Sequence, residues 1–180
     1  MTTFSVERLS LLIAQHTANV CRTMLNVDVT VAGARPHTAG PKGSVVSLIG
    51  LTGRWNGSGV VSCDGDVARR LSGRMLMTDF ADVNADVLDA IGELTNMIVG
   101  NVKEDIARDL GALAISTPTV IYGEGLQTRA VDGDIDARVC FACDGGVLEV
   151  HLSLLPSTRG PAMATPAIVT GSTQPITSGV

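Results

Sequence analysis

Residues 84–111, NADVLDAIGELTNMIVGNVKEDIARDLG, contain the strongest structural signal in the chain. Apolar residues recur there at three-and-four spacing, which is typical of the buried face of an α-helix. These residues are Val87, Ile91, Leu94, Ile98 and Val102. Asn84 is a favourable N-cap residue, and Gly111 is of the type that commonly follows a helix C-terminus. The pattern therefore predicts a long helix from Asn84 to Leu110.

The opposite face of this helix is polar. Its residues fall within about 80° of one another on a helix of about 3.6 residues per turn. They are Asp89, Glu93, Asn96, Gly100 and Lys103, of which Lys103 is expected to face solvent. Most polar helix faces are simply solvated, and that interpretation stays open here. Gly92 and Gly100, however, each cost a helix interior about 1 kcal/mol relative to alanine, which suggests that something approaches closely.

Helices and strands alternate in the rest of the chain. Further helices are predicted over residues 6–24, after the N-cap candidate Ser5, and from Asp64 or Asp66 to Met75. Strands are predicted at 26–31, 44–51, 59–62, 112–116, 119–122, 135–142 and 147–155. Turn residues at 52–57 and 144–146 predict two hairpins. We expect one α/β domain of the α+β type over 1–156, followed by a disordered tail at 157–180 that is rich in Pro, Ser, Thr and Gly.

Composition excludes several classes of protein. A formal net charge of −5 over 180 residues argues against a nucleic-acid partner, because that affinity comes from Lys and Arg that neutralise phosphates. Apolar runs such as 11–14 are much shorter than the roughly 20 residues that a membrane-spanning helix needs. The first residues, MTTFS, lack the basic and apolar regions of a secretory signal. We expect a cytoplasmic protein that contacts neither nucleic acid nor membrane.

The four cysteines leave one further kind of site open. Cys140 and Cys143 have CxxC spacing, and Cys21 and Cys63 could complete a four-sulfur zinc site or a redox module. Neither of the latter two has a partner at motif spacing, and cysteines of cytoplasmic proteins are normally reduced. Buried thiols, with no metal, are the favoured interpretation.

A proline downstream of the polar helix face completes a spaced pattern, Asp89-x3-Glu93-x2-Asn96-x21-Pro118. It resembles the (Asp/Ser)-x3-Glu-x2-Asn-x21-Pro signature of the CheC/CheX/FliY chemotaxis phosphatases, and ELTNMIVGN at 93–101 looks like the CheX form. Four such matches arise by chance on the order of once in a thousand sequences of this composition. The resemblance implies a CheC-like fold of two pseudo-repeated halves, with long helices packed on a largely antiparallel sheet.

The resemblance also implies a function in chemotaxis signalling. The substrate would be the aspartyl phosphate of a CheY-like response regulator, whose receiver domain carries its own Mg²⁺, so that the chain needs no cofactor. Asn96 would orient the attacking water, because an amide positions water without titrating, and Glu93 would pair with the regulator's lysine. Asp89, Gly100 and Pro118 would have supporting roles. CheX relatives form homodimers, so a homodimer is expected; a non-catalytic receiver-binding adaptor or flagellar-switch module is the alternative.

A pseudo-repeated fold predicts a second copy of the signature nearer the N-terminus. His16-x2-Asn19-x21-Pro41 keeps the spacing from Asn to Pro. His16, however, stands where Glu is required, and Leu12 stands where the acidic residue is expected. The pattern is either a decayed site or a coincidence, and as a decayed site it would leave one competent site per chain.

Overall fold

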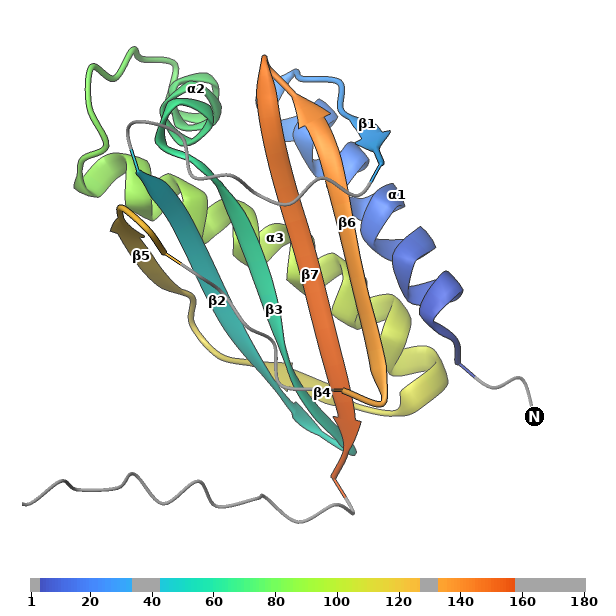
Figure 1. Ribbon diagram of the computed structural model, residues 1–180. Coiled ribbons are helices and arrows are strands. Elements are labelled where there is room, and N and C mark those ends of the chain that lie inside the picture. Colours follow the sequence, from blue (N-terminus) through green and yellow to red (C-terminus); the bar gives the residue numbers. More distant parts are fainter. Residues whose placement is uncertain (1–3, 34–42, 127–132, 158–180) are drawn as a thin grey trace, which may run out of the picture.

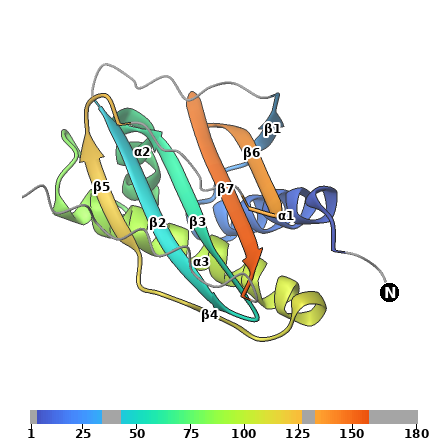
Figure 2. The same ribbon diagram turned by 60° about the horizontal axis from the view of Figure 1, so that its bottom comes forward.

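A two-layer arrangement of helices and one sheet forms the protein. The computed structural model describes residues 4–33, 43–126 and 133–157, which contain three helices and a seven-stranded antiparallel sheet. All three helices lie on one face of that sheet (Figure 1), and the turned view in Figure 2 shows the same separation into layers. The expected α+β class and antiparallel sheet are confirmed.

The helices begin where the capping residues predict. Their bounds are Val6–Leu25 for α1, Gly65–Leu76 for α2 and Ala85–Leu110 for α3. The side chains of Ser5, Asp64 and Asn84 each accept a hydrogen bond from the backbone N–H three residues later. Gly111 follows α3 as its C-cap, with φ of 91°. Local chemistry thus accounts for the ends of α3, the helix that carries the candidate site.

The strands follow the predicted hairpins with small shifts. Their bounds are Thr30–Ala32 (β1), Ser44–Gly53 (β2), Trp55–Asp64 (β3), Leu113–Ile115 (β4), Thr119–Gly123 (β5), Ile135–Cys143 (β6) and Gly146–Pro156 (β7). The order is β1-β6-β7-β3-β2-β4, and β5 pairs with β2 beside β4. The prediction of a strand over 26–31 is wrong at its start, because Asn26 adopts a left-handed conformation that ends α1. The first hairpin turns more tightly than predicted, since only Arg54 separates β2 from β3.

The apolar face of α3 packs onto the sheet as the spacing predicts, and all five residues of that stripe are buried. Gly59 of β3 lets the helix come close, because a Cβ there would lie 2.8 Å from Cγ2 of Val99. On one flank, Ser72 of α2 donates a hydrogen bond to the Val87 carbonyl at 3.2 Å. α1 also packs against α3. The outer face of α3 is left uncovered by α1 and α2.

The structure describes three of the four residues in the proposed second copy of the signature. His16 forms a hydrogen bond with Asp105 of α3, with 2.7 Å between Nε2 and Oδ2. Leu12 is buried in the core and Asn19 is exposed. Pro41 lies outside the described residues, as do residues 158–180 of the predicted tail. In this structure His16 therefore ties α1 to α3, and whether the pattern is a decayed site stays a prediction.

Candidate active site

The α3 ridge, which we define as Asp89, Glu93, Asn96, Gly100 and Lys103, runs along the outer face of the helix. Asp89 and Glu93 are exposed, whereas Asn96 is half-buried. Residues three apart on a helix are neighbours on its surface, so Glu93 and Asn96 lie one turn apart on the same side. The geometry expected from the spacing is therefore present. Because a helix backbone is more rigid than a loop, the Cα and Cβ atoms of Glu93 and Asn96 are held in fixed relative positions.

Neither Glu93 nor Asn96 has a hydrogen-bond or ion-pair partner within the described parts of the chain. Some other polar residues of α3 are paired: Asp105 contacts both His16 and Arg108, and Lys103 contacts Glu104 at 2.6 Å. Only 18% of the Lys103 side chain is exposed, so the expectation that it faces solvent is wrong. The unpaired carboxylate and carboxamide are thus the groups of this surface that are available to another molecule.

The signature proline lies directly beside this pair. A Cβ on Gly92 would lie 3.2 Å from Cγ2 of Val120 and 3.5 Å from Cγ of Pro118. The segment between β4 and β5 therefore packs closely on α3, one residue before Glu93. This contact gives a physical reason for Gly92 in the helix interior, and it places Pro118, with its fixed φ, at the edge of the ridge.

Gly100 has no comparable neighbour. The nearest atom to an added Cβ would be Cδ1 of Ile115, at 3.8 Å, which is an ordinary van der Waals distance. Packing within the described residues does not require glycine at this position, although glycine costs the helix about 1 kcal/mol. The space beside Gly100 lies on the ridge, one turn beyond Asn96, and is open to a partner.

The geometry of the described cysteines gives no support to a zinc site or redox pair built on Cys140 and Cys143. Side chains alternate along a strand, so Cys140 and Cys143, three residues apart in β6, point to opposite faces of the sheet. Cys140 donates a hydrogen bond to Oε2 of Glu149 at 3.7 Å on the face away from the helices. Burial raises the pKa of Cys143 to about 11 and that of Cys21 to about 12. No group of three or more potential metal ligands occurs among the described residues.

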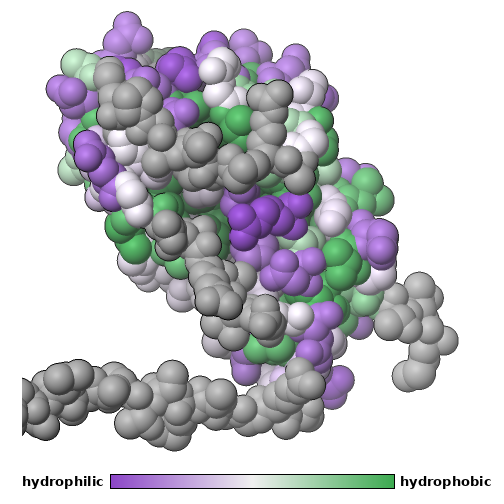
Figure 3. Space-filling view, viewed as in Figure 1, coloured by the Kyte–Doolittle hydropathy of each residue, from purple (hydrophilic) through white to green (hydrophobic). Residues whose placement is uncertain are grey.

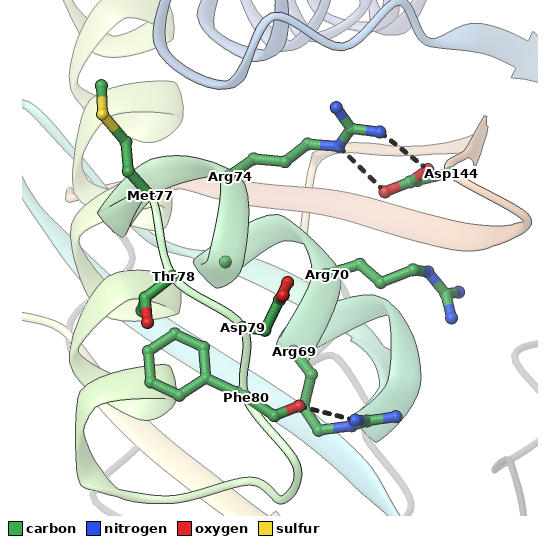
Figure 4. A pocket seen from close by; sticks show the side chains of 9 residues that line it. Arg69, Arg70, Arg74, Met77, Thr78, Asp79, Phe80 and Asp144 are labelled. Atoms are coloured by element: carbon green, nitrogen blue, oxygen red, sulfur yellow. Dashed lines mark hydrogen bonds and ion pairs between the residues drawn. The ribbon is translucent and has the colours of Figure 1, made fainter.

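A polar pocket next to α2 has no counterpart in the sequence predictions. It has a volume of about 540 Å³ and lies between α2, residues 77–80 and the β6–β7 turn. Figure 4 shows Arg74 paired with Asp144 of that turn, at 3.1 and 3.3 Å, while Arg69 binds the Phe80 carbonyl at 2.7 Å. The residues come from separate parts of the chain, and sequence spacing therefore gives no signal for this pocket.

Within the described residues, no helix has the length and apolar character needed to cross a membrane.

Comparison with known proteins gives consistent matches. The family model "Chemotaxis phosphatase CheX" matches residues 45–139, a range that contains the whole signature. The CheY-P phosphatase CheX of Thermotoga maritima is 28% identical over 109 residues, which are 56% of this chain and 70% of that protein.

Solved structures of similar fold extend the match to most of the chain. A putative chemotaxis protein from Desulfovibrio vulgaris Hildenborough is 30% identical, with a TM-score of 0.70, covering 81% of this chain and 96% of that one. The CheX of a CheX–CheY–BeF₃–Mg²⁺ complex from Borrelia burgdorferi shares the fold at 20% identity, with a TM-score of 0.64 and coverage of 81% and 96%.

Proposed function

Because this chain belongs to the CheX family of chemotaxis phosphatases, we propose that it accelerates hydrolysis of the aspartyl phosphate of a CheY-like response regulator. The Thermotoga relative is named a CheY-P phosphatase, and the Borrelia protein of this fold has been crystallised with CheY. The observation that carries the proposal is the pair Glu93 and Asn96, which share one exposed helix face and have no partner within the described residues.

Asn96 orients the attacking water. Water adds at phosphorus while the bond from phosphorus to the receiver's aspartate oxygen breaks, so that aspartate and inorganic phosphate are the products. Such a reaction passes through a loose transition state in which positioning and electrostatics dominate, and Mg²⁺ on the receiver holds the phosphoryl group. The Asn96 carboxamide offers one acceptor and two donors to the water and does not change charge with pH. Partial burial restricts the side-chain rotamers of Asn96, so fewer conformations compete with the one that orients the water.

Glu93 holds the receiver in register. It is exposed and has no ion pair within the described residues, so pairing with the receiver's lysine breaks no described interaction. Asp89, one turn earlier, adds negative potential on the same side and attracts a cationic group. Gly100 provides room for the receiver to approach the helix, and Pro118 keeps the β4–β5 segment packed beside Glu93. The homodimer expected from the resemblance stays a prediction that light scattering tests.

Replacement of Asn96 tests the catalytic assignment. We expect Asn96→Ala to lower the rate of phosphate release from a phosphorylated receiver by at least about a hundredfold, as when one positioning group for the transition state is lost. Affinity for the same receiver carrying BeF₃ and Mg²⁺ should change little. Asn101→Ala removes another half-buried amide of α3, off the ridge, and should keep wild-type activity.

Two other outcomes would change the conclusion. Wild-type release by a folded Asn96→Ala protein would contradict the role of Asn96. Binding of the receiver by the wild-type chain without any acceleration would instead favour the non-catalytic adaptor.

A further inference from the structure

Met77, the C-cap residue of α2, combines a backbone conformation that costs stability with an apolar side chain that gains no stability from burial. Its backbone is left-handed, with φ of 53°, a conformation that glycine and asparagine adopt more readily than methionine. Its side chain is also 94% exposed, the largest value for a large apolar residue in the described part of the chain. A glycine or asparagine would avoid the backbone cost and would expose no apolar side chain. Their combination at one position suggests that the methionine side chain is used.

Met77 lies beside the helix that carries the ridge. The α2 residue Ser72 contacts the Val87 carbonyl of α3 directly. In Figure 4 the Met77 side chain lies alongside α3 and points away from Arg70, and the chain then runs back past Thr78 and Phe80 toward the start of α3. Met77 therefore lies on the side of α2 that borders α3, the helix that carries Glu93 and Asn96.

A partner protein centred on Glu93 and Asn96 is large enough to reach Met77. A specific interface buries about 800 Å² on each partner, which corresponds to a disc of roughly 16 Å radius. The axes of packed helices are about 8–10 Å apart. A protein centred on Glu93 and Asn96 is therefore large enough to contact the neighbouring end of α2 as well.

The surroundings of Met77 are those of an apolar interface contact. The pocket that it borders is also lined by Arg70, Arg74 and Asp79. Interfaces commonly place an apolar contact within a polar rim, and methionine is enriched there because its flexible side chain adapts to the partner. Charged residues on both sides, those of the pocket and those of the ridge, provide such a rim here.

We propose that Met77 is an apolar contact for the receiver domain and helps to determine which receivers this chain accepts. The inference rests on the proposed function, because its occupant is the receiver whose phosphoryl group meets Glu93 and Asn96. A second copy of the chain fits this position less well, since a copy covering Met77 would also cover the ridge and exclude the substrate.

Met77→Asn tests the contact, because asparagine tolerates the left-handed backbone and removes the apolar side chain. The probe is the receiver domain, from the same genome, that the wild-type chain dephosphorylates fastest, loaded with BeF₃ and Mg²⁺ for binding. We expect Kd and KM to rise by about tenfold while kcat is unchanged, as for the loss of an interface anchor away from the chemistry. The melting temperature should be equal or higher.

Leu11→Gln is the matched control. Leu11 is 53% exposed on α1 and lies beside Val31 and Val139, on a different side of the molecule. This change should leave Kd and KM unchanged. A wild-type Kd for Met77→Asn, or an equal loss of affinity in the Leu11 variant, would overturn the inference.

An error in the role proposed for Met77 can be distinguished from an error in the proposed function. If the wild-type chain accelerates dephosphorylation and Asn96→Ala abolishes it, but Met77→Asn binds normally, only the role of Met77 is wrong. If the wild-type chain acts on no receiver of its genome, both proposals are wrong.

Discussion

The polar side chains on the two outer surfaces of this protein differ in whether they have partners within the chain. On the sheet face away from the helices, Arg138 pairs with Glu149 at 3.1 Å and His151 pairs with Asp136 at 2.8 Å. Figure 3 looks onto this face and shows hydrophilic side chains over the half of the sheet that holds β6 and β7. On the α3 ridge, Glu93 and Asn96 have no partner within the described residues.

The difference separates groups that stabilise the fold from groups available for recognition. A charged side chain that is already paired must break that pair before it can bind another molecule, and buried pairs are costly to break. An unpaired side chain on a rigid helix has no such cost. Polarity alone therefore does not identify a site on this molecule, and the lack of an internal partner for Glu93 and Asn96 within the described residues adds support for the α3 ridge.

Charge reversal on the ridge should give the largest loss of affinity for the receiver. Glu93→Lys replaces an attraction to the receiver's lysine with a repulsion, and loss of a close interfacial charge pair costs about 2–5 kcal/mol. We therefore expect affinity for the BeF₃-loaded receiver to fall by at least about thirtyfold, as measured by fluorescence titration. Glu104→Lys, a reversal on the same helix at a residue paired with Lys103, is the control and should have a much smaller effect. Equal losses in the two variants would mean that only overall charge matters.

The two glycines of α3 should respond in opposite directions. Gly92→Ala places a Cβ 3.2 Å from Val120 beside Pro118, and we expect the cost of displacing these neighbours, about 1–3 kcal/mol, to exceed the about 1 kcal/mol that alanine gains in a helix, so that the free energy of unfolding by urea falls. Gly100→Ala meets only Ile115 at an ordinary distance, so it should raise the free energy of unfolding by up to about 1 kcal/mol. The same variant should slow dephosphorylation, because it fills space on the ridge. A Gly100→Ala protein that is more stable and fully active would exclude Gly100 from docking.

The smallest effect on dephosphorylation is expected on the sheet face away from the helices, where the polar side chains are paired. Arg138→Ala leaves Glu149, whose side chain is only 4% exposed, without its cation. A buried carboxylate without its partner is costly, but the partial solvation of the Arg138 side chain reduces that cost, so we expect a loss of about 2 kcal/mol in the free energy of unfolding. The dephosphorylation rate at a temperature where the variant is folded should equal that of the wild-type chain. Removal of both charges in Arg138→Ala/Glu149→Gln should restore part of the stability, and a slowed reaction in either variant would show that this face takes part in function.

Local sequence signals predict the helices well and the site in part. The caps Ser5, Asp64 and Asn84 act within one turn, so the residues themselves carry the information. The sequence places Cys143 in the turn after the predicted strand 135–142, and only the structure shows that β6 continues to Cys143 and puts the thiols of Cys140 and Cys143 on opposite faces. Met77 gives no sequence signal at all, since its exposure and its left-handed backbone appear only in the folded chain.

What the sequence determined by itself is which residues share the outer face of α3. That follows from helix geometry, which depends on spacing alone, and it is sufficient to place Glu93 and Asn96 on one side of the helix. Only the tertiary structure decided which polar groups remain unpaired and why Gly92 is needed, because the relevant neighbours, such as His16 for Asp105 and Pro118 for Gly92, come from distant parts of the chain. Local geometry thus decides which residues share a helix face, and long-range packing decides which polar groups on that face remain unpaired.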